Sequence, residues 1–252
     1  MSAGIPCLAR FAPHPGGVAV VSMVDVEGKN AMSERFVGDL LGALREAEAW
    51  APLKVIVLAG LPDVFSSGAS MDMLRALARG EVAPADILLA KAVLDLPVPV
   101  IAAMEGHAVG GGLALGLAAD VVIIARESRY GATFMNMGFT PGMGMTRLLE
   151  HVVSPAIAAE LLFSGELRKG AWFEGRSGFN AILPRAEVLP RAHDVAARIA
   201  DKPRAALEIL KRTLSLGRRR AFEETHTLES LMHLVSFNGP DVLRRIEEQH
   251  GQ

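Results

Sequence analysis

The chain has little of several features that usually indicate a function. Its 252 residues include one cysteine, Cys7, which excludes an intramolecular disulfide and a zinc site built on paired cysteines. A reducing, cytoplasmic setting fits this cysteine usage. No basic segment followed by an apolar run opens the chain, and no window approaches the roughly 18 apolar residues of a membrane span. The formal net charge is −2 without a basic face, which argues against nucleic acid as a partner.

Sequence motifs for several kinds of catalysis are also missing. The glycine run 110–112 lacks the spacing of a dinucleotide-binding loop because Leu115 stands where the last glycine would be. No G-x-S-x-G sequence occurs, so covalent serine chemistry is not expected. The histidines share no metal-ligand spacing, and we expect neither a metal nor a cofactor. His107, just before the glycine run, is expected to fix the shape of its loop.

The pattern of apolar residues predicts an α/β fold. The β-branched run 18–24 is expected to form a strand, and Ser33 is suited to cap a helix that reaches about Trp50. Three short apolar runs have the character of strands buried on both faces: 54–59, 98–103 and 121–125. Helices are expected between them, at 71–79, from Pro84 onward and at 113–119. This alternation predicts right-handed crossover units.

The last third of the chain is expected to be helical. Strand signals nearly vanish from Pro141 onward, whereas Pro155 and Pro203 stand where helices would start. Apolar residues recur at helical spacing through Ile246. We expect a core over residues 1–195 and a helical region over 196–252 that packs on the core or on a neighbouring subunit.

Two glycine-containing loops are the most informative segments. Residues 65–71 and 105–113 each pass from the end of a strand into a helix, with small residues that leave backbone N–H groups unshielded. Two such loops could each direct one N–H at a single oxygen and so stabilise an enolate formed on a thioester carbonyl. Taken singly, each loop could equally be a tight turn.

In these loops the sequence resembles the crotonase superfamily of enoyl-CoA hydratases and isomerases, from about Val18 to Glu247. The resemblance implies an oxyanion hole formed by the backbone N–H groups of Ala69 and Gly111. It also implies a spiral core of ββα units with a C-terminal helical trimerisation region, in a homotrimer or hexamer.

Two positions differ from the hydratases of that superfamily. Where they carry two catalytic glutamates, this chain has Ala114 and Phe134. A methyl group and a phenyl ring cannot activate water or transfer a proton, so hydration is not expected.

Segments 136–144 and 233–238 look like the decarboxylating enzymes of polyketide β-branching cassettes. This similarity implies loss of carbon dioxide from a 3-methylglutaconyl group on an acyl carrier protein, with His233 as the proton donor. Those enzymes usually carry a lysine just after the first oxyanion loop to hold the substrate carboxylate, whereas this chain has Met71. Arg75, one helical turn further on, could supply the missing cation or could be a solvated surface residue.

Other readings of the same residues remain. Tyr130 and Phe134 could line the acyl pocket, although aromatic residues at strand ends are often core. His233 could act as acid and base in a double-bond isomerase. Met71 in place of the lysine favours this interpretation, because the lysine is the residue expected to hold a substrate carboxylate. A third reading is an acyl thioester binding protein without turnover, for coenzyme A or carrier-protein substrates.

Overall fold

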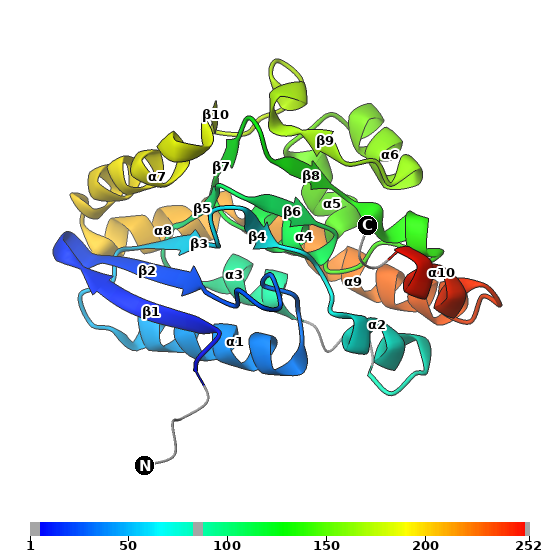
Figure 1. Ribbon diagram of the computed structural model, residues 1–252. Coiled ribbons are helices and arrows are strands. Elements are labelled where there is room, and N and C mark those ends of the chain that lie inside the picture. Colours follow the sequence, from blue (N-terminus) through cyan, green and yellow to red (C-terminus); the bar gives the residue numbers. More distant parts are fainter. Residues whose placement is uncertain (1–5, 83–87, 250–252) are drawn as a thin grey trace, which may run out of the picture.

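The computed structural model describes residues 6–82 and 88–249, and Figure 1 shows how its elements follow one another. The strands are β1 (Ala9–His14), β2 (Val18–Met23), β3 (Val55–Ala59), β4 (Val64–Ser66), β5 (Val100–Met104), β6 (His107–Val109), β7 (Val121–Ala125), β8 (Arg129–Gly131), β9 (Arg168–Lys169) and β10 (Ala181–Leu183). The helices are α1 (Glu34–Ala49), α2 (Met71–Ala78), α3 (Leu89–Asp95), α4 (Gly111–Leu117), α5 (Met145–Leu148), α6 (Pro155–Ser164), α7 (Arg185–Ala200), α8 (Arg204–Leu214), α9 (Leu216–Ser236) and α10 (Val242–Gln249). No helix in the described ranges is both long and apolar enough to cross a membrane.

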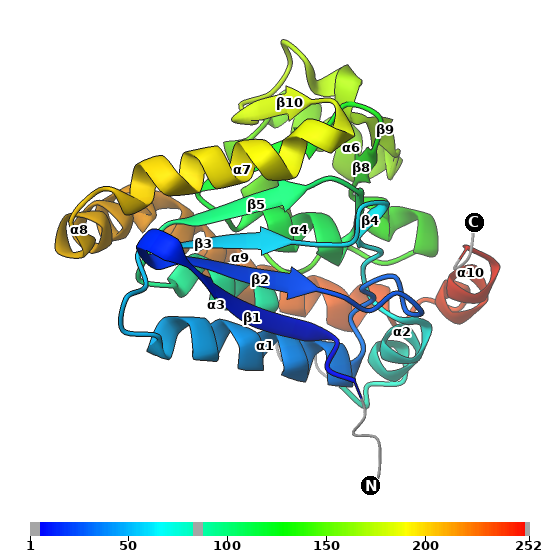
Figure 2. The same cartoon turned by 60° about the vertical axis from the view of Figure 1, so that its left-hand side comes forward.

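A six-stranded sheet in the order β1-β2-β3-β5-β7-β10 forms the centre of the fold. All its neighbouring strands pair in parallel except β1, which pairs with β2 in antiparallel register. Figure 2 shows α7 across one face of this sheet, with α1 and α3 on the other. Residues Val20, Val57, Ile101 and Ile123 pack toward α7, whereas their neighbours along each strand enter the main core. Burial on both faces explains why these strands are continuous apolar runs.

A second sheet, in the order β4-β6-β8-β9, carries the chain away from the carboxyl ends of the central strands. Its strands β4 and β6 follow β3 and β5 directly and pair in parallel. The chain therefore passes from a central strand to a short outer strand and then into a helix, twice. Both glycine-containing loops lie at these transitions, on the same side of the molecule.

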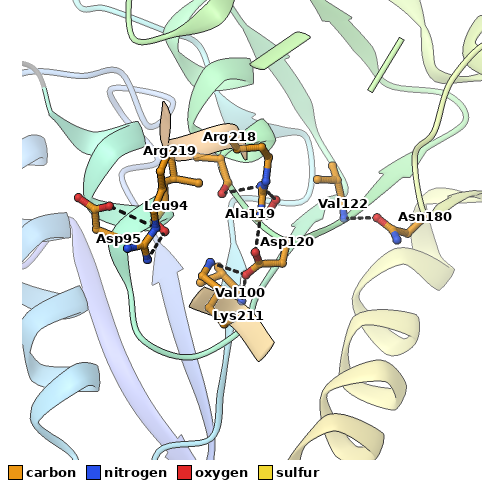
Figure 3. A network of polar contacts seen from close by, with 11 residues as sticks. Leu94, Asp95, Val100, Ala119, Asp120, Val122, Asn180, Lys211, Arg218 and Arg219 are labelled. Carbon is orange, nitrogen blue, oxygen red and sulfur yellow. Dashed lines mark hydrogen bonds and ion pairs between the residues drawn. The ribbon is translucent and has the colours of Figure 1, made fainter. Parts of the chain in front are cut away.

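The C-terminal helices are fastened to the core by the polar network in Figure 3. Asp120, immediately before β7, accepts a hydrogen bond from the Val100 backbone N–H and forms ion pairs with Lys211 of α8 and Arg218 of α9. Arg218 also donates to the carbonyl of Ala119. Because Lys211 is almost fully buried, its ammonium group depends on this carboxylate for compensation.

The predicted order of strands and helices is confirmed, with differences at particular elements. Strand β10 lies after Pro141 and completes the sheet beside β7, although few strand signals were expected there. A three-residue strand is too short for its periodicity to be recognised. The helix expected from residue 113 begins at Gly111, and the one expected from Pro84 starts outside the described residues. The expected division after residue 195 falls inside α7.

Candidate active site

The first glycine loop is shaped by the segment that precedes α1. Asn30 is fully buried, and its side-chain amide donates to the carbonyls of Phe65 (3.0 Å) and Met23 (3.3 Å). Ser66 returns a hydrogen bond from its hydroxyl to the Asn30 carbonyl at 2.8 Å. Asn30 has a φ of 52°, a left-handed conformation that asparagine adopts more readily than most residues. These contacts hold the loop before α2 in one conformation.

The two glycine loops touch each other, and glycine is what allows the contact. A methyl group on Gly68, whose φ is +89°, would lie 2.9 Å from the Val109 carbonyl oxygen and 3.8 Å from the Gly111 nitrogen. A methyl group on Gly112 would lie 2.5 Å from the carbonyl oxygen of Ser66. Side chains at either position would force the loops apart. The structure thus brings together the two segments that the sequence analysis singled out.

Gly111 is the first residue of α4, so its N–H has no acceptor within the helix. The positive end of the helix backbone dipoles also lies there, which favours a developing negative charge. The sulfur atoms of Met143 and Met32 lie 2.8 and 3.2 Å from the position that a methyl group on Gly111 would take. Two methionine side chains therefore pack against Gly111 on the side where a β-carbon would lie.

Ala69 lies in an isolated parallel bridge with Met32. Met32 donates to the Gly68 carbonyl at 2.7 Å, and Ser70 donates to the Met32 carbonyl at 3.3 Å. The bridge thus pairs Met32 with the residues on either side of Ala69, Gly68 and Ser70. In a parallel bridge of this kind, the N–H of the residue between them, Ala69, points away from Met32. Ser70 then caps α2 by accepting a hydrogen bond from the Met73 N–H.

His233 lies on α9 and is 6% exposed. Its Nε2 is 2.8 Å from the Thr140 carbonyl oxygen. Since a carbonyl can only accept, Nε2 carries the proton, and the neutral ring has its lone pair on Nδ1. Nδ1 is buried and has no hydrogen-bond partner in the described part of the chain. Burial lowers the pKa of His233, and the bond to Thr140 opposes this only in part.

Residues 140–146, called here the bridging loop, connect His233 to the glycine loops. A methyl group on Gly142 would lie 2.5 Å from Cε1 of His233. The next residue, Met143, has the sulfur atom that borders Gly111. The imidazole ring and the N–H at the start of α4 are thus separated by one short segment of backbone.

The resemblance implies that Phe134 and Ala114 stand where the hydratases carry their two glutamates. The Phe134 ring would lie 3.7 Å from a methyl group on Gly110, and it packs edge-to-face on Phe139. Phe139 in turn stacks on Phe237, the residue that follows α9. Ala114 is fully buried in α4. An apolar wall, rather than a carboxylate, borders the second glycine loop at Phe134.

The two residues considered for binding a substrate carboxylate lie on α2. Met71 is the first residue of this helix and is partly buried against the main core. Arg75 pairs with Asp72 at 3.7 Å and with Glu247 of α10 at 3.6 Å, and its side chain is 40% exposed. Its guanidinium group therefore already has carboxylate neighbours.

Tyr130 and His107 have structural contacts. The fully buried Tyr130 donates its hydroxyl proton to the Met104 carbonyl and accepts from the Ala125 N–H, which ties β8 to two central strands. Burial accordingly raises the pKa of Tyr130. Nδ1 of His107 accepts from the Arg129 N–H at 2.8 Å, and this contact fixes the loop as expected.

Sequence reasoning missed Glu229, a buried carboxylate on α9. It accepts hydrogen bonds from the N–H groups of Gly144 and Thr146 and from the Thr146 hydroxyl. The sequence feature that could have indicated it is a glutamate one helical turn before His233, on the apolar face of the predicted helix. Its partner loop is more than 80 residues away in sequence, so the pairing could not be inferred from spacing.

A cavity of about 540 Å³ lies at the other end of the sheet. Pro99 and Val121, at the amino ends of β5 and β7, line it together with Leu210 and Leu214 of α8. The glycine loops follow the carboxyl ends of the central strands. The charged residues Asp120, Lys211 and Arg218 also line this cavity, but they are paired with one another. We therefore place the candidate site at the glycine loops, beside the buried imidazole of His233.

Two glycine-containing loops that follow neighbouring central strands and touch each other are the arrangement expected of a site where two backbone N–H groups bind one oxygen. The chain belongs to the enoyl-CoA hydratase/isomerase family, whose sequence pattern matches residues 14–244.

Among its relatives is the bacillaene synthase decarboxylase PksI of Bacillus subtilis, 38% identical over 231 residues, which cover 92% of this chain and 93% of that protein. A solved structure from a dehydratase/decarboxylase couple of polyketide β-branching superimposes with a TM-score of 0.94 at 36% identity, covering 97% of this chain and all of that one. The ECH2 decarboxylase domain of CurF from Lyngbya majuscula gives 0.90 at 34% identity, with the same coverage. A relative from Thermus thermophilus that is named as an enoyl-CoA hydratase is 30% identical over 207 residues, 79% of this chain and 81% of that protein.

Proposed function

We propose that the protein decarboxylates a 3-methylglutaconyl-type enoyl thioester in polyketide β-branching. The observation that carries this proposal is the contact between the two glycine loops. One short loop away lies Nδ1 of His233, which has no hydrogen-bond partner among residues 6–82 and 88–249. The similarity to decarboxylases with that role supports the same reaction.

In the proposed reaction, the bond between the γ-carbon and the carboxylate breaks, and carbon dioxide leaves. The electron pair moves through the conjugated system onto the thioester oxygen, which gives a dienolate. The N–H groups of Ala69 and Gly111 stabilise this oxyanion, because fixed donors in a site that excludes water need no reorganisation. A proton then goes to the γ-carbon, and the product is a 3-methylcrotonyl thioester.

His233 delivers that proton in two steps: its Nδ1 takes up a proton from solvent when the negatively charged substrate binds, and the imidazolium then donates this proton to the γ-carbon. Its bond to Thr140 occupies Nε2, so Nδ1 is the ring nitrogen available for proton transfer. The lowered pKa keeps the imidazole neutral in the free enzyme at neutral pH. A bound carboxylate or dienolate raises that pKa again by attraction, so the proton is taken up when the negative charge is present.

Hydration is not part of the proposal. A hydratase needs one group that deprotonates water and another that protonates carbon. Ala114 and Phe134 supply neither, and Phe134 adds an apolar wall against Gly110. An apolar surface instead favours decarboxylation, since removing water from the substrate carboxylate destabilises the bound substrate relative to the transition state.

We also propose that Met71 faces the substrate carboxylate and that Arg75 binds it after exchanging its weak partners Asp72 and Glu247. Both existing contacts are longer than 3.5 Å and lie at the surface, so exchange costs little. The carrier is an acyl carrier protein in this proposal, with coenzyme A as the alternative.

The proposed assembly is a homotrimer or a pair of trimers. Helices α8 and α9 expose large apolar residues, and such surfaces mark protein interfaces. They are Ile209, Leu210, Leu214, Leu216, Leu228, Leu231, Met232, Leu234 and Val235. Light scattering after size-exclusion chromatography measures the mass directly, and a monomer at micromolar concentration would contradict the assembly.

The deciding experiment incubates the enzyme with 3-methylglutaconyl acyl carrier protein and follows the intact mass of the carrier, beside the coenzyme A thioester and a His233→Ala control. Loss of carbon dioxide that the variant lacks supports decarboxylation. An unchanged mass with a moved double bond favours the isomerase. Binding without any change of the acyl group favours the thioester-binding protein.

A further inference from the structure

Three polar residues of α9 form hydrogen bonds with the bridging loop. Glu229, His233 and Ser236 are four and three residues apart and therefore share one face of the helix. Glu229 binds the backbone of Gly144 and Thr146, His233 donates to the Thr140 carbonyl, and the Ser236 hydroxyl accepts from the Thr140 N–H. One helix face thus holds both ends of a loop whose middle touches the candidate site.

Glu229 makes the strongest of these contacts. Its Oε2 lies 2.7 Å from the Gly144 nitrogen, and its Oε1 lies 2.7 Å from the Thr146 hydroxyl and 3.1 Å from the Thr146 nitrogen. The carboxylate is 2% exposed, and hydrogen bonds to a charged acceptor are stronger than neutral ones. Burial raises the pKa of Glu229, while the three donors oppose that rise. The group is costly to bury, and its hydrogen bonds go to the bridging loop.

The loop that Glu229 holds would not adopt this conformation unaided. Met143 has a φ of 60° and Gly144 a φ of 76°. The left-handed region is unfavourable for a residue with a side chain, so it persists where surrounding contacts impose it. The Glu229 carboxylate anchors the residue after Met143. The strained turn directs the Met143 sulfur toward Gly111 and presses Gly142 against the His233 ring.

We propose that Glu229 is a positioning residue for the reaction at this site: through the bridging loop it sets the place of Met143 beside Gly111 and of the imidazole against Gly142. This role rests on the proposed function. Glu229 itself touches neither the substrate nor the oxyanion. It fixes the distance between the proton donor and the carbon that receives the proton, and a misplacement of about 1 Å can lower a rate roughly 100-fold.

The test compares Glu229→Gln with Glu224→Gln, an exposed glutamate on the same helix. Glutamine keeps the size of the side chain but turns one acceptor into an N–H₂ group that faces a backbone donor. We expect kcat for carbon dioxide release to fall roughly 10- to 100-fold with little change in KM. Glu224→Gln should match the wild type. Thr146→Val, which removes one donor and leaves the carboxylate, should give a smaller loss in the same direction.

A double-variant comparison separates positioning from stability. If Glu229 acts through His233, Glu229→Gln combined with His233→Ala should be no slower than His233→Ala alone. A Glu229→Gln enzyme with unchanged kcat, or one whose loss simply multiplies that of His233→Ala, would overturn the positioning role.

Nitrogen-15 spectra of the imidazole rings provide a readout that does not depend on turnover. The wild type should show His233 as the Nε2–H tautomer, and Glu229→Gln should shift or mix its signals. Unaltered signals would also overturn the role. A wild type that releases no carbon dioxide would instead refute the proposed function, and the spectra would still decide whether Glu229 positions the ring.

Discussion

Replacing Gly111 with proline would remove one oxyanion-hole donor while leaving the helix intact. Gly111 is the first residue of α4, where proline is well tolerated because its missing N–H has no helical acceptor. Gly110 lies outside the α region, with φ of 53° and ψ of −119°, so it avoids the conformation that a following proline disfavours.

Gly111→Ala is the matched control, since it adds the same β-carbon but keeps the N–H. That carbon would lie 2.8 Å from the sulfur of Met143 and 3.2 Å from that of Met32. Both sulfurs belong to flexible side chains that can turn aside. We expect the alanine variant to lose mainly stability, by about 1–3 kcal/mol. Proline should cost in addition the loss of an oxyanion donor, about 10²–10³ in rate.

The assay measures kcat/KM for carbon dioxide release from the carrier-bound substrate, with thermal unfolding to show that both variants are folded. The informative ratio is proline to alanine, because it cancels the effect of the added carbon. A folded proline variant within about threefold of the alanine variant, less than 1 kcal/mol in the barrier, would refute the assignment of Gly111.

Three further predictions follow from the same contacts. Gly142→Ala should displace the His233 ring, because Cε1 of that ring would lie 2.5 Å from the new methyl group. In a stopped assay of carbon dioxide release, kcat should fall about as it does in His233→Ala, roughly 10²–10⁴-fold, and a wild-type rate would contradict the role of the ring. Asp120→Ala should lower the free energy of unfolding in urea by about 3–5 kcal/mol, because the buried Lys211 loses the carboxylate that compensates its charge. A change under about 1 kcal/mol would argue against this role of Asp120. Burial lowers the pKa of His233, so the imidazole binds its second proton at higher pH in the unfolded chain than in the folded one. Acidification below about pH 6.5 should therefore lower the free energy of unfolding of the wild type more than that of His233→Gln. Parallel urea titrations across pH measure this, and an identical pH dependence of the two proteins would contradict it.

The sequence by itself was enough for the central strands and for the two glycine loops. Buried parallel strands must be apolar on both faces, so runs such as 54–59 are recognisable without any partner. Glycine at positive φ or at a close backbone approach leaves an equally local signal, as at Gly68. The resemblance to the decarboxylating enzymes also rested on short local segments, and the comparisons with PksI and CurF confirm it.

The tertiary structure alone decided which distant groups meet. That Gly112 packs on Ser66, that Nε2 of His233 binds the Thr140 carbonyl, and that Glu229 holds the bridging loop each depend on contacts between segments tens of residues apart. Tyr130 shows the same limit, since only its two backbone hydrogen bonds reveal a structural residue. Local patterning reports how each segment is buried, but hydrogen-bond partners are fixed by the packing of the whole chain.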